Sequence, residues 1–155
     1  MNSLIEQEIP GMTNLRDQLL TMISDGDLAY KLPGNNLTLG GLCEEMGYTQ
    51  QVYTHSFKTL HLDWSYRDSQ PEVSSIASLK AWYEKLDTEL IEVLSQLSED
   101  DIQTKQIDRG HGFVPTIQVQ FQVYHEALLI FYAKVSIYLK ALKKELTDEW
   151  KIGIG

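Results

Sequence analysis

The residue whose surroundings most suggest chemistry is His125, because Glu126 follows it directly. In zinc metalloproteases, a His-Glu pair is followed by a second histidine four residues after the first, so that both rings bind the ion from one helix face. The corresponding residue here is Leu129, whose side chain cannot coordinate a metal. The pair therefore does not predict a metalloprotease.

A second group of chemically active residues lies between Asp108 and Gly112, where an acid, an arginine and a histidine alternate with glycines. The guanidinium of Arg109 could bind a carboxylate or a phosphate in such a loop. The interpretation that we favour is a local turn, in which the glycines supply positive φ angles. The sequence leaves both interpretations open.

Aromatic and basic residues also gather between His61 and Arg67, in a segment that ends at Pro71. They could line the mouth of a pocket at the end of a helical bundle. We favour a packing role, because aromatic residues in a connection usually cover the edge of a core. The residues that we predict for such a pocket are His55, His61, Trp64 and Arg109.

Cys43 is the only cysteine, so the chain can form no internal disulfide. A position near the start of a helix can lower the pKa of a thiol, but the neighbouring Glu44 and Glu45 would oppose a thiolate. We predict a small core residue, and a cytoplasmic protein that needs no oxidising compartment.

The longest regular pattern runs from Ile117 to Leu142 and predicts the central helix of the fold. Its apolar residues alternate spacings of four and three, which places them in one row along a helix. A second row at Leu129, Tyr132 and Leu139 widens this face beyond what one partner helix could cover, so a bundle is expected. We call the first row the seam: Ile117, Phe121, Tyr124, Leu128, Phe131, Val135, Tyr138 and Leu142.

Three further helices and one long crossover complete the predicted all-α four-helix bundle, a single domain over residues 1–155. Each helix is bounded by a capping residue or a turn former. The predicted helices run from Thr13 or Asn14 to Gly26, from Thr38 to Leu60, and from Ser74 or Ser75 to Leu97, with a crossover over residues 98–115 and a short tail over 150–155.

Three glycines, Gly40, Gly41 and Gly47, weaken the second predicted helix, since each costs up to about 1 kcal/mol in a helix interior. They could mark the close approach of a neighbouring backbone or a ligand. We favour simple tolerance of glycine.

Composition excludes several classes of protein. Hydrophobic residues make up 43% of the chain and charged residues 23%, values that are ordinary for a globular domain. The net charge of −9 would repel nucleic acid phosphates. The densest apolar run is cut by Lys134, well short of the ~20 residues that span a bilayer. We expect neither nucleic acid nor membrane as a partner.

Four strings together resemble the DinB-like family of four-helix bundles. They are TLGGL at 38–42, LDWS at 62–65, LKAWYEKLD at 79–87 and YHEALL at 124–129. The resemblance implies an up-up-down-down bundle, often dimeric, with a long crossover before the last helix. It also implies a divalent metal held by a histidine of the second helix and a His-x-x-x-His pair of the fourth, and in some members a thiol-dependent transferase or isomerase activity.

This chain departs from the metal pattern that the resemblance implies. The matching positions are Glu45, His125 and Leu129, so one of the three histidines is present. Glu45 and His125 could remain as a two-ligand site for nickel or zinc. We favour a buried histidine hydrogen-bonded to a glutamate, because a two-ligand site binds metal weakly without further support. No cofactor is expected under that interpretation.

Two functions follow from the resemblance. The first is a small-molecule-binding or degenerate family member, of unknown specific activity, that has lost the usual metal site. The alternative is a divalent-metal-dependent transferase or isomerase of the thiol-cofactor type, with Glu45 and His125 as its remaining ligands. Metal content separates the two.

An apolar strip off the seam, formed by Ile130, Ala133 and Ile137, bears on assembly. A four-helix monomer need not bury this strip, so a second subunit could cover it. We predict a homodimer. The alternative, almost as well supported, is that the crossover over residues 98–115 of the same chain covers the strip.

Overall fold

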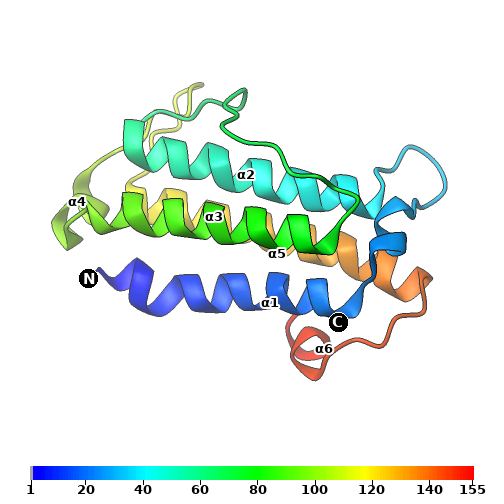
Figure 1. The fold of residues 1–155 in the computed structure, drawn as a ribbon. Coiled ribbons are helices and arrows are strands. Elements are labelled where there is room, and N and C mark those ends of the chain that lie inside the picture. Colours follow the sequence, from blue (N-terminus) through cyan, green and yellow to red (C-terminus); the bar gives the residue numbers. More distant parts are fainter. Residues whose placement is uncertain (1) are drawn as a thin grey trace.

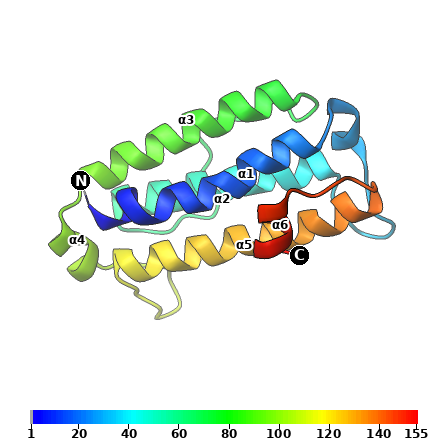
Figure 2. The ribbon, with the colours of Figure 1, turned by 90° about the horizontal axis from the view of Figure 1, so that it is seen from below.

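The computed structural model describes residues 2–155 and consists of helices and their connections (Figure 1). Within residues 2–155, four long α-helices lie side by side, and two short α-helices cover parts of the bundle (Figure 2). The predicted all-α four-helix bundle is therefore confirmed. The helices are α1 (Ile9–Met22), α2 (Leu39–Thr59), α3 (Ile76–Ser95), α4 (Glu99–Thr104), α5 (Ile117–Ala141) and α6 (Asp148–Gly153).

Side-chain caps mark the starts of α2, α3 and α5, at or near the boundaries that the sequence predicted. The Thr38 side chain accepts a hydrogen bond from Gly41 N at the start of α2, and Ser75 accepts one from Ser78 N at the start of α3. These bonds satisfy backbone donors that have no partner within the helix. At the start of α5 the cap is Thr116, whose side chain accepts a hydrogen bond from Val119 N, and the helix begins at Ile117 as predicted.

The first helix begins earlier than predicted. A π-helical turn over Leu4–Glu8 leads directly into α1. Pro10 lies in the first turn of α1, where its missing N–H costs no helical hydrogen bond. Thr13 is therefore inside the helix, and its hydroxyl donates to Ile9 O instead of capping a terminus.

Two segments that the sequence predicts to be irregular also form helices. Within the predicted crossover, α4 is held by a capping box in which Ser98 and Asp101 bond each other's backbone N–H groups. The predicted tail over residues 150–155 overlaps α6, which begins two residues earlier and whose Trp150 is fully buried beside Tyr132. Burial of one large aromatic side chain explains why so short a helix docks on the bundle (Figure 2).

The order of helix directions differs from the one that the resemblance implied. Asn2 bonds Leu94 O, so α1 starts where α3 ends, and Asp25 accepts from Ile76 N, so α1 ends where α3 starts. Helices α2 and α3 are parallel to each other, and α1 and α5 run the opposite way (Figure 1). The order is up-down-down-up instead of up-up-down-down.

The long crossover is consequently a different segment. Because α2 and α3 are parallel, residues 60–75 must return along the whole of α2, a length of about 31 Å at 1.5 Å per residue. Sixteen extended residues can span about 50 Å, which is sufficient. The predicted crossover over residues 98–115 stays at one end of the bundle, where it joins two antiparallel helices (Figure 1).

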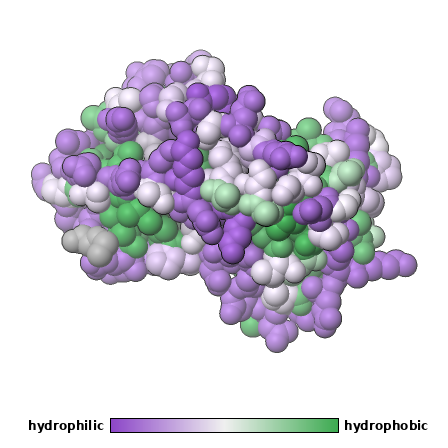
Figure 3. Space-filling view, in the orientation of Figure 1, coloured by the Kyte–Doolittle hydropathy of each residue, from purple (hydrophilic) through white to green (hydrophobic). Residues whose placement is uncertain are grey.

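The seam and the second row of α5 supply much of the core. Seam residues Phe121, Tyr124 and Leu128 are at most 2% exposed, and Tyr132 and Leu139 of the second row are also buried. Leu129, by contrast, is 40% exposed. On the face shown in Figure 3, hydrophilic residues cover much of the surface and hydrophobic residues form separate patches. No helix within residues 2–155 is long and apolar enough to cross a bilayer.

Two of the glycines in α2 allow close approach, contrary to the interpretation that we favoured. A Cβ at Gly40 would lie 2.9 Å from Val73 O, a backbone atom of the crossover. A Cβ at Gly47 would lie 2.2 Å from the Trp82 ring. Glycine at these positions lets the crossover and α3 pack against α2.

Replacing Gly47 by alanine should therefore destabilise the protein. Alanine favours the helix by up to about 1 kcal/mol, but displacing the buried Trp82 ring should cost more, giving a net loss of about 1–2 kcal/mol. Gly11→Ala is the control, because a Cβ at Gly11 meets no atom within 4 Å and should be neutral or stabilising. Urea denaturation of both variants measures the difference, and equal midpoints would contradict the packing role of Gly47.

Candidate functional site

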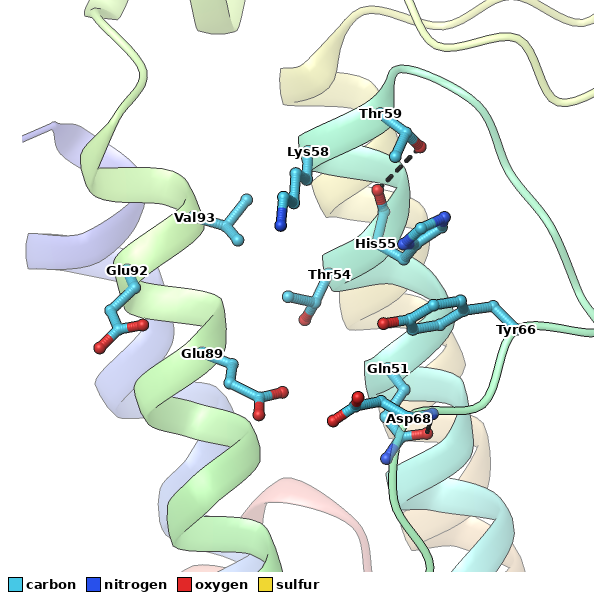
Figure 4. A pocket seen from close by; sticks show the side chains of 10 residues that line it. All are labelled: Gln51, Thr54, His55, Lys58, Thr59, Tyr66, Asp68, Glu89, Glu92 and Val93. Carbon is cyan, nitrogen blue, oxygen red and sulfur yellow. Dashed lines mark hydrogen bonds between the residues drawn. The ribbon is translucent and has the colours of Figure 1, made fainter.

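A cleft of about 380 Å³ lies between α2, α3 and the crossover (Figure 4). Its volume falls within the range of small-molecule sites. Thr54 forms its floor from α2, Glu89 and Val93 project from α3, and Tyr66 and Asp68 come from the crossover. Three segments that are distant in sequence therefore build one site.

Gln51 fixes the crossover against α2. This glutamine is 2% exposed, and its Nε2 donates to Ser69 O at 3.0 Å and to Ser69 Oγ at 2.8 Å. Its Oε1 accepts from Asp68 N at 3.2 Å. The Ser69 hydroxyl also accepts from Trp82 Nε1 at 2.9 Å, which ties the crossover to α3. Partly buried hydrogen bonds thus hold the wall of the cleft and bring Asp68 and Tyr66 to its edge.

An aromatic stack forms one side of the cleft. The His55 and Tyr66 rings are parallel within 13°, with centroids 3.8 Å apart. The pKa of Tyr66 is raised, first by partial burial and then by the negative charges of Asp68 and Glu89. Tyr66 is therefore a neutral hydroxyl donor and acceptor near neutral pH.

Carboxylates outnumber cations around the cleft. Asp68, Glu89 and Glu92 line it together with Lys58. At the rim, Lys85 Nζ lies 3.3 Å from Asp68 Oδ2 and 3.5 Å from Glu89 Oε1, and these bonds raise the pKa of Lys85. Such exposed pairs contribute little to stability and exchange readily. Within residues 2–155, Glu92 has no salt-bridge partner. The cleft therefore favours a positively charged group.

Thr54 carries a polar atom that the protein does not use. The residue is 8% exposed, and its buried Oγ1 has no hydrogen-bond partner in the described part of the chain. A threonine hydroxyl in a helix usually bonds the carbonyl one turn earlier, and a buried hydroxyl without a partner costs roughly 1–3 kcal/mol. Figure 4 shows Thr54 at the centre of the cleft, on the side of α2 that faces α3.

Of the four residues predicted for a pocket, only His55 lines this cleft. Trp64 lies on the other side of α2, where it packs against Tyr53 at a centroid distance of 5.9 Å. His61 is exposed, with Nδ1 3.9 Å from Asp108 Oδ2. The four residues do not form one pocket, because the crossover divides them between opposite faces of α2.

Arg109 points into the end of the bundle. Its Nη1 donates to Gln120 Oε1 at 2.6 Å and contacts Tyr53 OH at 3.4 Å. The glycines at 110 and 112 have φ angles of 77° and 82°, and Asp108 accepts from Gly110 N. This is the local turn that we favoured for the segment, with the guanidinium bonded inside the protein.

The structure does not bring Glu45 and His125 together. Glu45 lines a groove between α2 and α5 with Lys134 and Tyr138. His125 precedes Lys134 by nine residues, which at 100° per residue places the two on opposite sides of α5. His125 therefore faces away from the α2 side of α5, on which Glu45 lies.

The heights of the two residues along the bundle differ as well. Tyr53 and Tyr124 are neighbours, with ring centroids 5.1 Å apart, so His125 lies near the level of Tyr53. Glu45 is eight residues earlier on α2, or about 12 Å along its axis. Neither the predicted hydrogen bond nor one ion shared by both side chains fits this geometry. No cluster of three or more metal-ligating side chains occurs among residues 2–155.

Cys43 behaves as the sequence predicted. The side chain is fully buried, and burial raises its thiol pKa to about 12. Tyr83 OH donates to Cys43 O at 2.6 Å, which links α3 to α2. A thiol with so high a pKa is protonated and unreactive near neutral pH.

Most residues that line the α2–α3 cleft were not predicted from the sequence, although one signal was present. Gln51, Thr54, His55 and Lys58 follow the spacing i, i+3, i+4, i+7, which places four polar side chains on one face of α2. The carboxylates of the cleft show no comparable sequence pattern, because Asp68 and Glu89 come together only through the path of the crossover.

Comparisons with known proteins agree with this architecture. No family model matches the sequence, and no curated protein matches it. Among solved structures, a DinB-like protein of Bacillus subtilis, YjoA, matches with a TM-score of 0.73 and 15% identity over 94% of this chain and 96% of that one. A DinB-like protein of Bacillus cereus ATCC 10987 matches with a TM-score of 0.68 and 14% identity over 90% of this chain and 93% of its own. The chain therefore has the fold of the DinB-like proteins.

Proposed function

We propose that the protein binds a small organic cation in the cleft between α2 and α3. The observation that carries this proposal is the buried Thr54 hydroxyl, which has no partner in the protein and lies at the floor of a cleft with an excess of carboxylates. A ligand that hydrogen-bonds this hydroxyl would remove the cost of its burial. The cleft is thus suited to binding, and no activity is assigned to it.

The chemistry of the lining defines the ligand class. An ammonium group would be attracted to Asp68 and Glu89, where it would compete with the exposed Lys85, or to Glu92. A second polar atom of the ligand would reach Thr54. Tyr66 and Val93 offer apolar contact for a short carbon chain. A primary amine with a short chain and a hydroxyl or second amine matches these groups.

The alternative of a metal-dependent transferase has less support from the site. The fold alone does not determine an activity. Glu45 lies on α2, whereas the side chain of His125 faces away from the α2 side of α5. The residues present therefore do not fit the metal that the family resemblance implied. Calorimetric titration with nickel and zinc tests this alternative: tight binding that is lost in both Glu45→Gln and His125→Gln would support it over the proposal.

The proposal is tested with ethanolamine, 1,4-diaminobutane and choline as probes, using calorimetry and thermal shift. We expect at least one primary amine to bind, and choline to bind less tightly because it has no N–H to donate. Glu89→Gln should weaken binding about tenfold, the effect of roughly 1.4 kcal/mol expected for a lost charge-assisted hydrogen bond.

Thr54→Val separates a ligand contact from a structural role. Valine has nearly the same shape and removes an unsatisfied hydroxyl, so the free protein should be as stable as the parent or more so. Amine affinity should nevertheless fall. Thr88→Val is the control, since Thr88 is exposed on α3 and bonds Glu84 O in its own helix. Failure of all three probes to bind, or binding that neither Thr54→Val nor Glu89→Gln changes, would refute the proposal.

A further inference from the structure

The α2–α3 cleft has two chemically different ends. Asp68 and Glu89 lie at one end, where both accept hydrogen bonds and carry negative charge. Thr54 and Lys58 lie toward the other end and offer hydrogen-bond donors (Figure 4). The two carboxylates come from the crossover and α3, whereas both donors come from α2. A ligand that uses the whole cleft therefore needs a donor at one end and an acceptor at the other.

Thr54 and Lys58 form a pair of donors on α2. They are four residues apart, so their side chains are neighbours on one face of the helix. The buried Thr54 hydroxyl has no hydrogen-bond partner in the described part of the chain. None of the salt bridges formed within residues 2–155 includes Lys58. A carboxylate has two acceptor oxygens, so one such group can bond the hydroxyl and the ammonium at the same time.

The distance between the two ends sets the length of the ligand. Asp68 N donates to Gln51 Oε1, so Asp68 lies near the level of Gln51 on α2. Thr54 and Lys58 follow Gln51 by about 4.5 and 10.5 Å along the helix axis. A carboxylate held between these two donors would lie roughly 5–8 Å from an ammonium group at Asp68. Charged groups on a single carbon atom are too close together for this, whereas a chain of about three or four methylene groups fits.

We propose that the ligand of the α2–α3 cleft is an ω-amino acid, a zwitterion with an ammonium and a carboxylate at opposite ends of a short chain. The ammonium binds Asp68 and Glu89. The carboxylate accepts hydrogen bonds from Thr54 and Lys58. This inference rests on the cation site proposed above, to which it adds a carboxylate subsite.

The other charged residues around the cleft leave both subsites accessible. Glu92 lines the same cleft, but Figure 4 shows its carboxylate turned away from Lys58. Lys85 contacts Asp68 and Glu89 from the rim, with a side chain that is 52% exposed. Exposed ion pairs of this kind are weak, and the displaced Lys85 ammonium returns to water. A ligand ammonium can therefore replace Lys85 without leaving an unpaired charge inside the protein.

Calorimetry with matched four-carbon probes tests the carboxylate subsite. The probes are butylamine, 1,4-diaminobutane and 4-aminobutanoate, with glycine as a zwitterion that is too short. We expect 4-aminobutanoate to bind about fivefold more tightly than butylamine, near the upper end of what one exposed ion pair contributes. It should also bind more tightly than 1,4-diaminobutane, whose second ammonium meets Lys58. Glycine should bind more weakly than 4-aminobutanoate because it cannot reach both ends.

Lys58→Glu should reverse the preference, so that 1,4-diaminobutane binds more tightly than 4-aminobutanoate. Lys80→Glu is the matched control, because it changes the net charge equally at an exposed position of α3 outside the cleft. That variant should keep the preference of the parent protein. The measured quantity is a ratio of two affinities for the same sample, so a partly unfolded fraction of Lys58→Glu does not alter it.

The results separate this inference from the function on which it rests. If butylamine binds the parent protein and 4-aminobutanoate binds no more tightly, the carboxylate subsite is refuted and the cation site stands. The same conclusion follows if Lys58→Glu keeps the parent preference, or if Lys80→Glu reverses it as well. If none of the probes binds the parent protein, the cation site itself is refuted and the carboxylate subsite with it.

Discussion

Replacing Arg16 by methionine should lower the free energy of unfolding by about 3 kcal/mol, at the lower end of the range for breaking a buried ion pair. Arg16 is 1% exposed in the middle of the bundle. Its guanidinium donates to Gln50 Oε1 at 2.7 Å and to Asp87 Oδ2, and Gln50 Nε2 donates to Asp87 Oδ1 at 2.8 Å. One network therefore joins α1, α2 and α3.

The cost arises from what the variant leaves behind. Without Arg16, the amide oxygen of Gln50 loses its donor and the carboxylate of Asp87 loses its cation in a half-buried position. The Asp87 side chain is 23% exposed, so water can compensate in part. The Tyr83 ring, 4.3 Å from the guanidinium, also loses a cation–π contact.

Urea denaturation of three variants checks this prediction. Arg16→Met should show the full loss, whereas Arg16→Met combined with Asp87→Leu should recover part of it, because no charge then remains in the core. Lys80→Met on the exposed surface of α3 serves as the control and should be nearly silent. A loss below 1 kcal/mol for Arg16→Met would show that the network does not stabilise the bundle.

Replacing Leu90 by alanine should cost about 2–5 kcal/mol, the range for a buried leucine that leaves a cavity. Leu90 is 1% exposed and belongs to the apolar row that predicted α3. Its neighbour Ile91 is 38% exposed on the same helix, so Ile91→Ala removes a similar volume from the surface and should cost less than about 1 kcal/mol.

This adjacent pair makes a sharp comparison, since helix position and protein context are shared. Both variants are measured by chemical denaturation under the same conditions, with circular dichroism to confirm the helical content of the folded state. Similar midpoints for Leu90→Ala and Ile91→Ala would mean that the apolar row of α3 does not face the core as described.

Helices and their buried faces could be predicted because they depend on short-range rules. The alternation of three and four in α5 places Phe121, Tyr124 and Leu128 in one row whatever the helix packs against. Thr38 and Ser75 mark helix starts through bonds that span three residues. These features are local, so the sequence by itself determined them.

Helix direction and the path of the crossover are not local. No local pattern in residues 60–75 predicts that they return along α2. That path depends on tertiary hydrogen bonds such as those between Gln51 and Ser69. The α2–α3 cleft depends on the same contacts, because Asp68 reaches Glu89 only once α2 and α3 are parallel.

The partner helices also decide which polar side chains of a helix lie close to each other. The sequence placed His125 on the central helix, but its distance from Glu45 depends on which side of α5 packs against α2. Likewise, Leu128 and Leu129 are adjacent leucines, and the sequence pattern placed both on the core face, yet Leu128 is buried and Leu129 is exposed. The sequence by itself thus determined the helices and their apolar rows. Which side chains share a site was decided by the packing of the helices, because such contacts depend on the relative rotation and direction of elements that are far apart in the chain.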